Sequence, residues 1–197
     1  MWVMSMKKST GLLLFFLLLV LIAVSGCTGG PLPVTTPRPG ELALQLSDLP
    51  EGYVKSIEGN VTGLDLPEEY RNLGLQDGYA VSFFRSSNGT DMTGITQIIA
   101  KFSRDRKDEI LSATRGPSPD GDPGGLRVKR LTDLHVGEES EAYEVTTRED
   151  ALVDIRFYTV TFVKEDVFET IMMTGTITDI GLLKDLAKLA ETKIILN

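Results

Sequence analysis

Cysteine and histidine are almost missing from this sequence of 197 residues, in which Cys27 and His135 are the only examples. A single cysteine cannot form a disulfide within the chain, and one cysteine with one histidine cannot supply the four ligands of a structural zinc site. Histidine is also the commonest general base, and a cysteine thiolate is a frequent nucleophile. We therefore expect no disulfide framework, no metal site and no cofactor.

Basic residues are outnumbered by acidic ones, with 20 Lys and Arg against 28 Asp and Glu. Residues 1–26 hold two of the lysines and no acid, so the rest of the chain has 18 against 28, a net charge of −10. An acid interrupts the densest basic segment, Arg104-Asp105-Arg106-Lys107. Because proteins bind nucleic acids through basic patches, we expect no nucleic-acid partner.

Long apolar runs are also scarce: the single example extends from Gly11 to Val24, a length of 14 residues. A transmembrane helix needs about 20 apolar residues, whereas the apolar region of a signal peptide takes about 7 to 15. Lys7 and Lys8 precede the run, and Val24-Ser25-Gly26-Cys27 ends it. This order of charge, apolar run and small residues predicts an N-terminal export signal.

The segment Val24-Ser25-Gly26-Cys27 resembles the lipobox of bacterial and archaeal lipoproteins. The resemblance implies cleavage between Gly26 and Cys27 and a lipid on the Cys27 thiol, which would hold the chain at the outer face of the cell membrane. Lipidation also removes the liability of a lone exposed thiol. The alternative is an uncleaved transmembrane anchor with an incidental cysteine, and the sequence leaves open whether the signal is cleaved or retained.

Three regions follow from this interpretation. Residues 1–26 form the signal peptide, and residues 27–40 form a lipidated cysteine with a tether that contains four prolines and three glycines. Such a composition favours extended chain rather than a packed core. Residues 41–197 have the length of a single exported domain.

Alternation of apolar and polar residues predicts an antiparallel sheet in this domain. The expected strands cover Tyr79–Phe83, Ile95–Phe102, Ala142–Thr147, Ala151–Lys164 and Val167–Thr176. The apolar phase of the fourth strand changes near Phe157, which predicts a β-bulge. The polar residues Lys164-Glu165-Asp166 predict a hairpin turn between the last two strands.

Helices are expected over Leu66–Leu73, over Asp105–Arg115 and from Thr178 or Asp179 to the C-terminus. The last has the clearest apolar stripe, formed by Leu183, Leu186, Ala187, Ala190 and Ile194. Such a stripe covers one face of a sheet. The predicted fold class is α+β: an antiparallel sheet of about five to six strands with helices packed on one face, the C-terminal helix included.

His135 is the natural starting point for a search for catalysis. The residues near it in the sequence that would complete a triad are Asp133, Glu138 and Ser140. A triad is defined by its geometry rather than by proximity in sequence, so we expect an ordinary loop histidine. No spacing among the acids around it, Glu138, Glu139 and Glu141, picks out a catalytic pair. The sequence therefore predicts no catalytic residue.

The sequence also contains a segment similar to a calcium loop and two N-glycosylation sequons. The segment Pro117–Gly125 is similar to a calcium loop, but Gly124 and Leu131 stand where an EF-hand needs oxygen ligands, and no phosphate-binding loop is present. Asn60-Val61-Thr62 and Asn88-Gly89-Thr90 are possible N-glycosylation sites at Asn60 and Asn88, both expected in loops.

The absence of a catalytic constellation favours a membrane-anchored surface lipoprotein whose exported domain is a non-enzymatic binding or interaction module. Its partner would be an unknown protein or a small hydrophobic ligand. The alternatives are an extracytoplasmic hydrolase that uses carboxylates, which a deep polar cleft would favour, and a carrier of a lipid or hydrophobic ligand, which a dry tunnel between helix and sheet would favour.

Overall fold

The computed structural model describes residues 37–61, 72, 74, 77–87, 89–114, 126–147 and 156–196. Cys27, Asn88 and the segment 117–125 lie outside these residues, as does most of the helix expected over Leu66–Leu73. The short helix α2 (Pro39–Leu42) comes first, with Pro39 and Leu42 buried. Pro39 and Gly40, at the end of the expected tether, thus belong to a helix.

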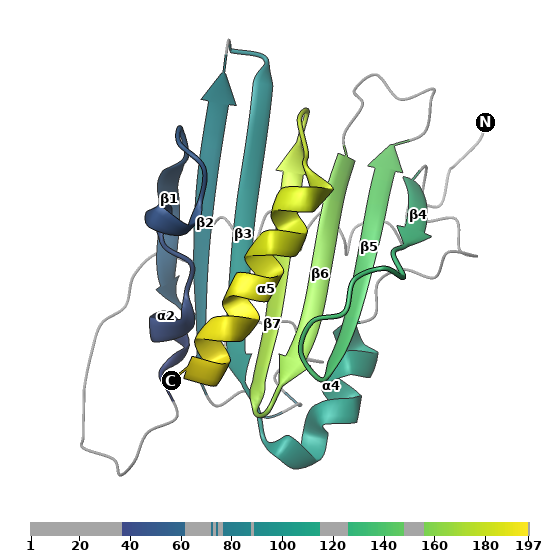
Figure 1. Cartoon of the computed structure of the whole chain (residues 1–197). Helices are drawn as coiled ribbons and strands as arrows, with labels where there is room; N and C mark the ends of the chain where they lie inside the picture. Colours follow the sequence, from purple (N-terminus) through teal and green to yellow (C-terminus); the bar gives the residue numbers. More distant parts are fainter. Residues whose placement is uncertain are drawn as a thin grey trace, which may run out of the picture.

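The fold is built on one antiparallel sheet of seven strands (Figure 1). Along the sheet the order is β1-β2-β3-β7-β6-β5-β4. The strands are β1 (Val54–Asn60), β2 (Asp77–Ser87), β3 (Asp91–Lys101), β4 (Leu126–Arg130), β5 (Glu139–Thr147), β6 (Arg156–Lys164) and β7 (Val167–Gly175). Two meanders, β1 to β3 and β4 to β7, therefore meet where β3 pairs with β7.

The hairpin predicted between the last two strands is confirmed, and the strands expected over Tyr79–Phe83 and Ile95–Phe102 also form one. β2 pairs with β3, and β6 pairs with β7 across a turn in which Glu165 has a φ of 56°, the conformation that tight hairpin turns favour. The β-bulge expected near Phe157 is wrong, because β6 pairs without a register shift with β5 from Arg156 to Val163 and with β7 from Arg156 to Lys164. Towards its end β6 is buried on both faces, so apolar residues occur at consecutive positions. In the sequence this looks like a change in which face is apolar, which is why the sequence predicts a bulge.

The expected count of five to six strands is too low, because the two edge strands β1 and β4 were missed. Both are largely exposed, and neither has a clear apolar phase. They are held by pairing with β2 and β5 rather than by burial of their own side chains. Alternation is a signal of one buried face, so strands without such a face escape it.

The C-terminal helix α5 (Ile180–Leu196) crosses one face of the sheet diagonally over β3, β7 and β6 (Figure 1). Asp179 caps it: its Oδ1 accepts hydrogen bonds from the Gly181 and Leu182 amides, at 2.8 and 3.2 Å. The predicted stripe is buried, with Leu183, Leu186, Ala187 and Ala190 at most 2% exposed. None of the helices formed by the described residues combines the length and hydropathy needed to span a bilayer.

The main core lies between this sheet face and a cover made of α5, α2 and the 3-10 turn η1 (Leu46–Asp48). Lys193 on α5 ties the cover together, because its Nζ donates to the Ala43 carbonyl at 3.0 Å and to Asp48 Oδ2 at 2.6 Å. The largest fully buried hydrophobic side chains are Phe83, Phe162, Leu42, Leu44, Ile95, Ile99, Ile171, Met173, Leu183 and Leu186.

The helices do not all pack on one face, which corrects that part of the prediction. A 3-10 turn, η3 (Arg104–Arg106), leads into α4 (Lys107–Thr114). Ile110 of α4 packs with Ala100, Phe102, Val163 and Phe168 in a second cluster. Ala100 and Phe168 oppose each other in the register and alternate with the core residues of their strands, so this cluster lies on the other face of the sheet.

Candidate functional site

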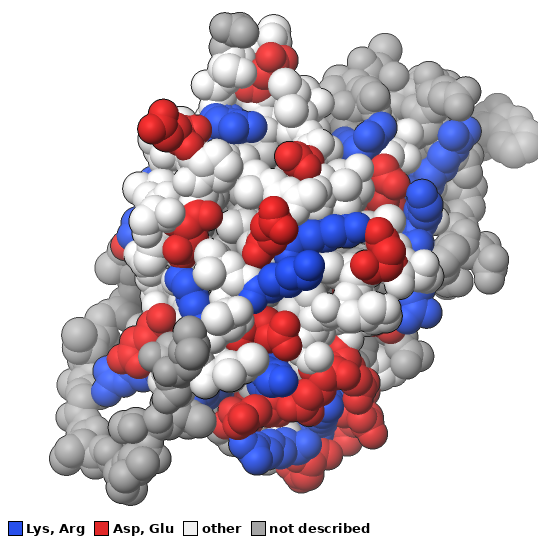
Figure 2. Space-filling model, viewed as in Figure 1, with Lys and Arg blue, Asp and Glu red and all other residues white. Residues whose placement is uncertain are grey.

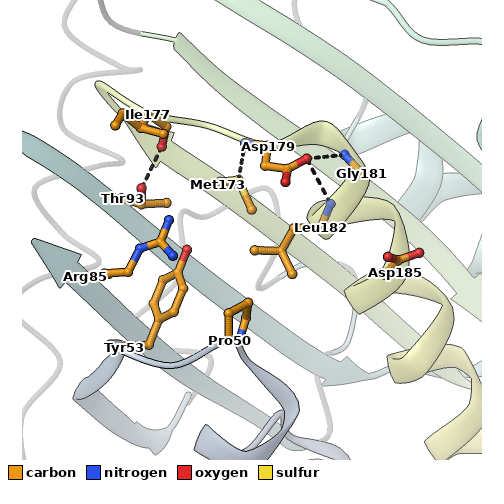
Figure 3. A pocket seen from close by; sticks show the side chains of 10 residues that line it. All are labelled: Pro50, Tyr53, Arg85, Thr93, Met173, Ile177, Asp179, Gly181, Leu182 and Asp185. Carbon is orange, nitrogen blue, oxygen red and sulfur yellow. Dashed lines mark hydrogen bonds between the residues drawn. The ribbon is translucent and has the colours of Figure 1, made fainter. Parts of the chain in front are cut away.

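A recess of about 360 Å³ opens where β7 leads into α5, beside the first residues of β1 (Figure 3). Its volume lies at the lower end of the range for small-molecule sites. Its floor is apolar and its walls carry charge. The lining residues are Pro50, Tyr53, Arg85, Thr93, Met173, Ile177, Asp179, Gly181, Leu182 and Asp185.

The first wall is a tyrosine covered by an arginine. Gly52, with a φ of 92°, turns the chain just before β1, and Tyr53 then lies beside Arg85 of β2. The Arg85 guanidinium carbon lies 4.8 Å from the centre of the Tyr53 ring, within the range of a cation–π interaction. In the described part of the chain, Arg85 has no carboxylate partner.

The Tyr53 hydroxyl is the unusual group of this wall. The residue is only 7% exposed, yet its hydroxyl makes no hydrogen bond to any described residue. The nearby Thr93 hydroxyl donates instead to the Ile177 carbonyl at 2.6 Å. Leaving a buried hydroxyl without a partner costs about 1–3 kcal/mol. A ligand acceptor at this position would recover that energy.

The phenol is suited to donate a hydrogen bond. Burial raises the pKa of Tyr53 above its ordinary value. The positive charge of Arg85 and the nearby Thr93 hydroxyl oppose this shift, and the negative charge of Asp179 reinforces it. The Thr93 hydroxyl is thus close to the phenol, although the two do not meet the geometry of a hydrogen bond. The phenol therefore stays protonated at neutral pH.

The second wall is the start of α5, which presents two carboxylates. Asp179 uses Oδ1 to cap the helix, whereas its Oδ2 accepts no hydrogen bond from the described residues. Asp185 lies six residues further along, nearly two helical turns away, and also lines the recess. Its side chain is exposed, and in Figure 3 its carboxylate points away from Tyr53 and Arg85. The Met173 sulfur, on the floor, accepts a hydrogen bond from the Asp179 amide at 3.2 Å. The cap thus fixes Asp179 relative to the sheet.

The junction between β7 and α5 holds both walls in register. Thr176 N donates to the Met92 carbonyl at 3.0 Å, and Thr176 Oγ1 donates to the Thr90 carbonyl at 3.1 Å. A side chain at Gly175 would put its Cβ 2.0 Å from the Met92 oxygen, so only glycine fits there. The recess is therefore bounded by a rigid connection rather than by a free loop.

The residues around His135 do not assemble into a triad. Ser140 Oγ accepts from the Val136 amide at 3.3 Å and donates to the Leu134 carbonyl at 3.5 Å. Asp133 pairs with Lys184 at 2.5 Å. Glu138 accepts from Lys107 and from the Glu165 amide, both at 3.0 Å. His135 is exposed and makes no hydrogen bond or ion pair with any described residue. The other three residues that could have formed a triad with it are bonded to other groups.

The core contains a second unusual polar group, a hydrogen-bonded pair of Gln97 on β3 and Glu169 on β7. Both are fully buried, and Gln97 Nε2 donates to Glu169 Oε1 at 2.5 Å. The Leu44 amide donates to Gln97 Oε1 at 2.7 Å, which fixes the orientation of the Gln97 amide. Glu169 Oε2 has no hydrogen-bond partner among the described residues, and burial raises the pKa of Glu169 to about 8, against the opposing effects of Gln97 and Lys193. The acid is therefore neutral at physiological pH.

A second recess, of about 370 Å³, is present around His135. It is lined by Arg130, His135, Val136, Gly137, Glu138, Glu139, Ser140 and Glu141. The contacts given above engage Ser140 and Glu138 within the fold and leave His135 without a partner among the described residues.

Among the described residues, no three His, Cys, Asp or Glu side chains gather closely enough to hold a metal ion. On the face that α5 covers, acidic and basic side chains are interspersed (Figure 2). Of the possible glycosylation sites, Asn60 is exposed at the end of β1 rather than in a loop, and Asn88 lies outside the described residues.

Sequence reasoning did not identify the recess residues. Tyr53, Arg85 and Asp179 are individually unremarkable and come from three distant segments. A signal existed for Gln97 and Glu169, because each is a polar residue in the buried phase of an apolar strand. The register of β3 and β7, which brings these two side chains together, could not be read from the sequence.

Comparison with known proteins gives similarity in structure but not in sequence. No family model and no curated protein matches the chain. An X-ray structure of a putative uncharacterised protein (Rv0999 ortholog) from Mycobacterium smegmatis aligns with 81% of this chain and 97% of that one, with 9% identity and a TM-score of only 0.48. The chain is similar to the extracellular domain of PknH from Mycobacterium tuberculosis, with a TM-score of 0.61 and 11% identity over 85% of this chain and 100% of that domain, a likeness that shows a common fold.

Proposed function

We propose that this chain is a membrane-anchored surface lipoprotein, and that its exported domain is a non-enzymatic binding module with its ligand site at the recess beside Tyr53 and Arg85. The observation that carries the proposal is the buried Tyr53 hydroxyl without a partner, next to a cation without a carboxylate partner in the described structure. Both groups leave hydrogen-bonding capacity unused, and a bound ligand would satisfy both.

The anchoring part of the proposal rests on the N-terminal segment. A 14-residue apolar run followed by Val24-Ser25-Gly26-Cys27 has the form of a lipoprotein signal. The structural neighbour with the higher similarity is an extracellular domain, which agrees with export of this fold. A lipid on Cys27 would then keep the binding domain at the outer face of the membrane.

The recess supports a binding module better than the two alternatives. A carrier of lipids needs an apolar cavity, whereas charged side chains form two walls of this one. A hydrolase needs a group that activates water or attacks a substrate. Asp179 Oδ1 caps α5, and the Thr93 hydroxyl donates to a backbone carbonyl, so both groups have structural tasks. Asp185 is the other acid of the recess, and no described histidine, serine or cysteine lines the recess beside it.

The test is to measure binding with the full-length protein in detergent. A panel of monocarboxylates, amines, amino acids and monosaccharides is screened by ligand-observed NMR. We expect at least one class to bind, and its binding to be lost in Arg85→Met, which keeps an apolar contact with Tyr53 but removes the charge. Arg104→Met is the matched control, because Arg104 forms an exposed ion pair with Glu165 and does not line the recess.

Two results would refute the proposal: no binding by any class in the panel, or binding that Arg85→Met leaves as strong as Arg104→Met does. Circular dichroism spectra and melting curves of both variants establish that they are folded.

A further inference from the structure

The distribution of charge across the recess indicates which ligand it takes. Arg85 stands on the β2 side, and Asp179 and Asp185 stand on the α5 side (Figure 3). No ion pair joins the two sides within the described structure, so the opposite charges are held apart rather than neutralised. This arrangement is complementary to a molecule that carries both a negative and a positive group.

We propose that the recess binds a small zwitterion, with its carboxylate on Arg85 and Tyr53 and its ammonium group on Asp179 and Asp185. This inference rests on the proposed binding function and specifies its ligand class. A guanidinium offers paired N–H donors that fit a carboxylate, and charge-assisted hydrogen bonds of this kind are among the strongest in proteins.

Tyr53 supplies the second donor for the carboxylate. The ring is stacked under the Arg85 guanidinium, and in Figure 3 its hydroxyl lies beside that group. The phenolic oxygen is closed to solvent in this conformation, so a carboxylate on Arg85 would reach the phenolic proton with a shift of the Arg85 side chain that covers the ring. The hydroxyl lacks a partner in the described structure, so a ligand carboxylate would complete its hydrogen bonding.

The α5 wall is built to receive an ammonium group. One oxygen of Asp179 is held by the Gly181 and Leu182 amides, and the other accepts no hydrogen bond from the described residues. Asp185 is exposed and adds a second negative charge nearly two helical turns away. Gly181 lies between them and has no side chain to obstruct the approach. The Asp179 oxygen that accepts no hydrogen bond from the described residues can accept one from an ammonium group, and Asp185 adds electrostatic attraction from a greater distance.

The floor limits the ligand to a small molecule. Met173, Leu182 and Pro50 provide an apolar base between the two charged walls. A short aliphatic segment that joins the carboxylate to the ammonium group would pack on this base. An amino acid or a short ω-amino acid has this chemistry.

The experiment compares glycine, β-alanine, 4-aminobutanoate and 5-aminopentanoate with pentanoate and pentylamine, which each carry one of the two charges. Affinities for the full-length protein in detergent are measured by NMR titration. We expect the best zwitterion to bind about tenfold or more tightly than either singly charged analogue, because each lost charged hydrogen bond costs at least that factor.

Variants assign each charge to its wall. Asp179→Asn combined with Asp185→Asn should remove the preference for the zwitterion over pentanoate while retaining the helix cap, since asparagine caps helices as well as aspartate. Tyr53→Phe should weaken all carboxylates without affecting pentylamine. Asp108→Asn, on α4, is the control for loss of an acid outside the recess and should change nothing.

The outcomes separate the ligand class from the binding function. Pentanoate that binds as tightly as every zwitterion, with binding still dependent on Arg85, would overturn the zwitterion and leave the binding module intact. A zwitterion preference that survives the double asparagine variant would also overturn the assignment. Absence of binding by every probe here and in the wider panel would refute both proposals.

Discussion

Replacing Glu169 with glutamine should change how the stability of the domain depends on pH. Burial raises the pKa of Glu169 from 4.5 to about 8. The unfolded chain therefore releases this proton from about pH 4.5 upwards, whereas the folded chain keeps it until about pH 8. The contribution of Glu169 to the free energy of unfolding is fully present below about pH 4.5, and it is lost as the pH rises towards 8.

The magnitude follows from the interval between the two pKa values. It spans about 3.5 pH units, and each unit corresponds to about 1.36 kcal/mol, so the loss by pH 8.5 amounts to about 5 kcal/mol at most. Glutamine resembles the neutral acid: its oxygen can still accept the hydrogen bond from Gln97, and it does not ionise. The Glu169→Gln variant should therefore gain stability relative to the parent by up to this amount as the pH rises.

Urea unfolding, followed by circular dichroism at several pH values between about 4 and 9, measures this difference directly. Glu51→Gln is the matched control, because Glu51 is exposed and its substitution removes one charge without touching the core. The reasoning is refuted if the free-energy difference between Glu169→Gln and the parent is the same at both ends of this range, or if Glu51→Gln shows the same trend.

Three further changes test other parts of the structure. Cys27→Ser should leave the precursor uncleaved and unlipidated, and mass spectrometry that finds the same mature N-terminus in the variant would contradict the lipoprotein assignment. Leu186→Ala should lower the free energy of unfolding by about 2–5 kcal/mol, since this α5 side chain is only 2% exposed in the core. An unchanged urea midpoint would mean that the helix is peripheral. Gly175→Ala should lower it by about 3 kcal/mol or more, because its Cβ meets the Met92 oxygen at 2.0 Å, whereas Gly59→Ala, with no atom within 4 Å of its Cβ, should have little effect on the melting temperature.

The elements that the sequence predicted correctly are those whose signal is local. A capping aspartate and an apolar stripe at helical spacing predict α5, and both signals lie within the segment itself. Alternation over Tyr79–Phe83 and Ile95–Phe102 correctly predicted strands within β2 and β3, which the structure extends and pairs as a hairpin. In such segments the spacing of apolar residues indicates both the type of element and the face that it buries.

The elements that were missed depend on the rest of the fold. β1 and β4 bury little of their own, and they become strands because β2 and β5 offer unpaired edges. α4 was predicted as a helix, but its placement on the opposite face from α5 depends on Ile110 meeting Phe168, which is far away in the sequence. No local pattern can state which face a helix covers when both faces of the central strands are apolar.

The candidate site is even harder to predict from local sequence, because its residues come together only through the pairing of strands that are distant in the sequence. Tyr53 follows a glycine turn, Arg85 lies towards the end of β2, and Asp179 is an ordinary helix cap. Each residue has an adequate local explanation, so a search by motif passes over all three. Only the pairing of β1 with β2, and of β3 with β7, brings the arginine, the phenol and the helix start to one end of the sheet. The unused hydrogen-bonding capacity of that end, rather than any motif, is what points to a ligand.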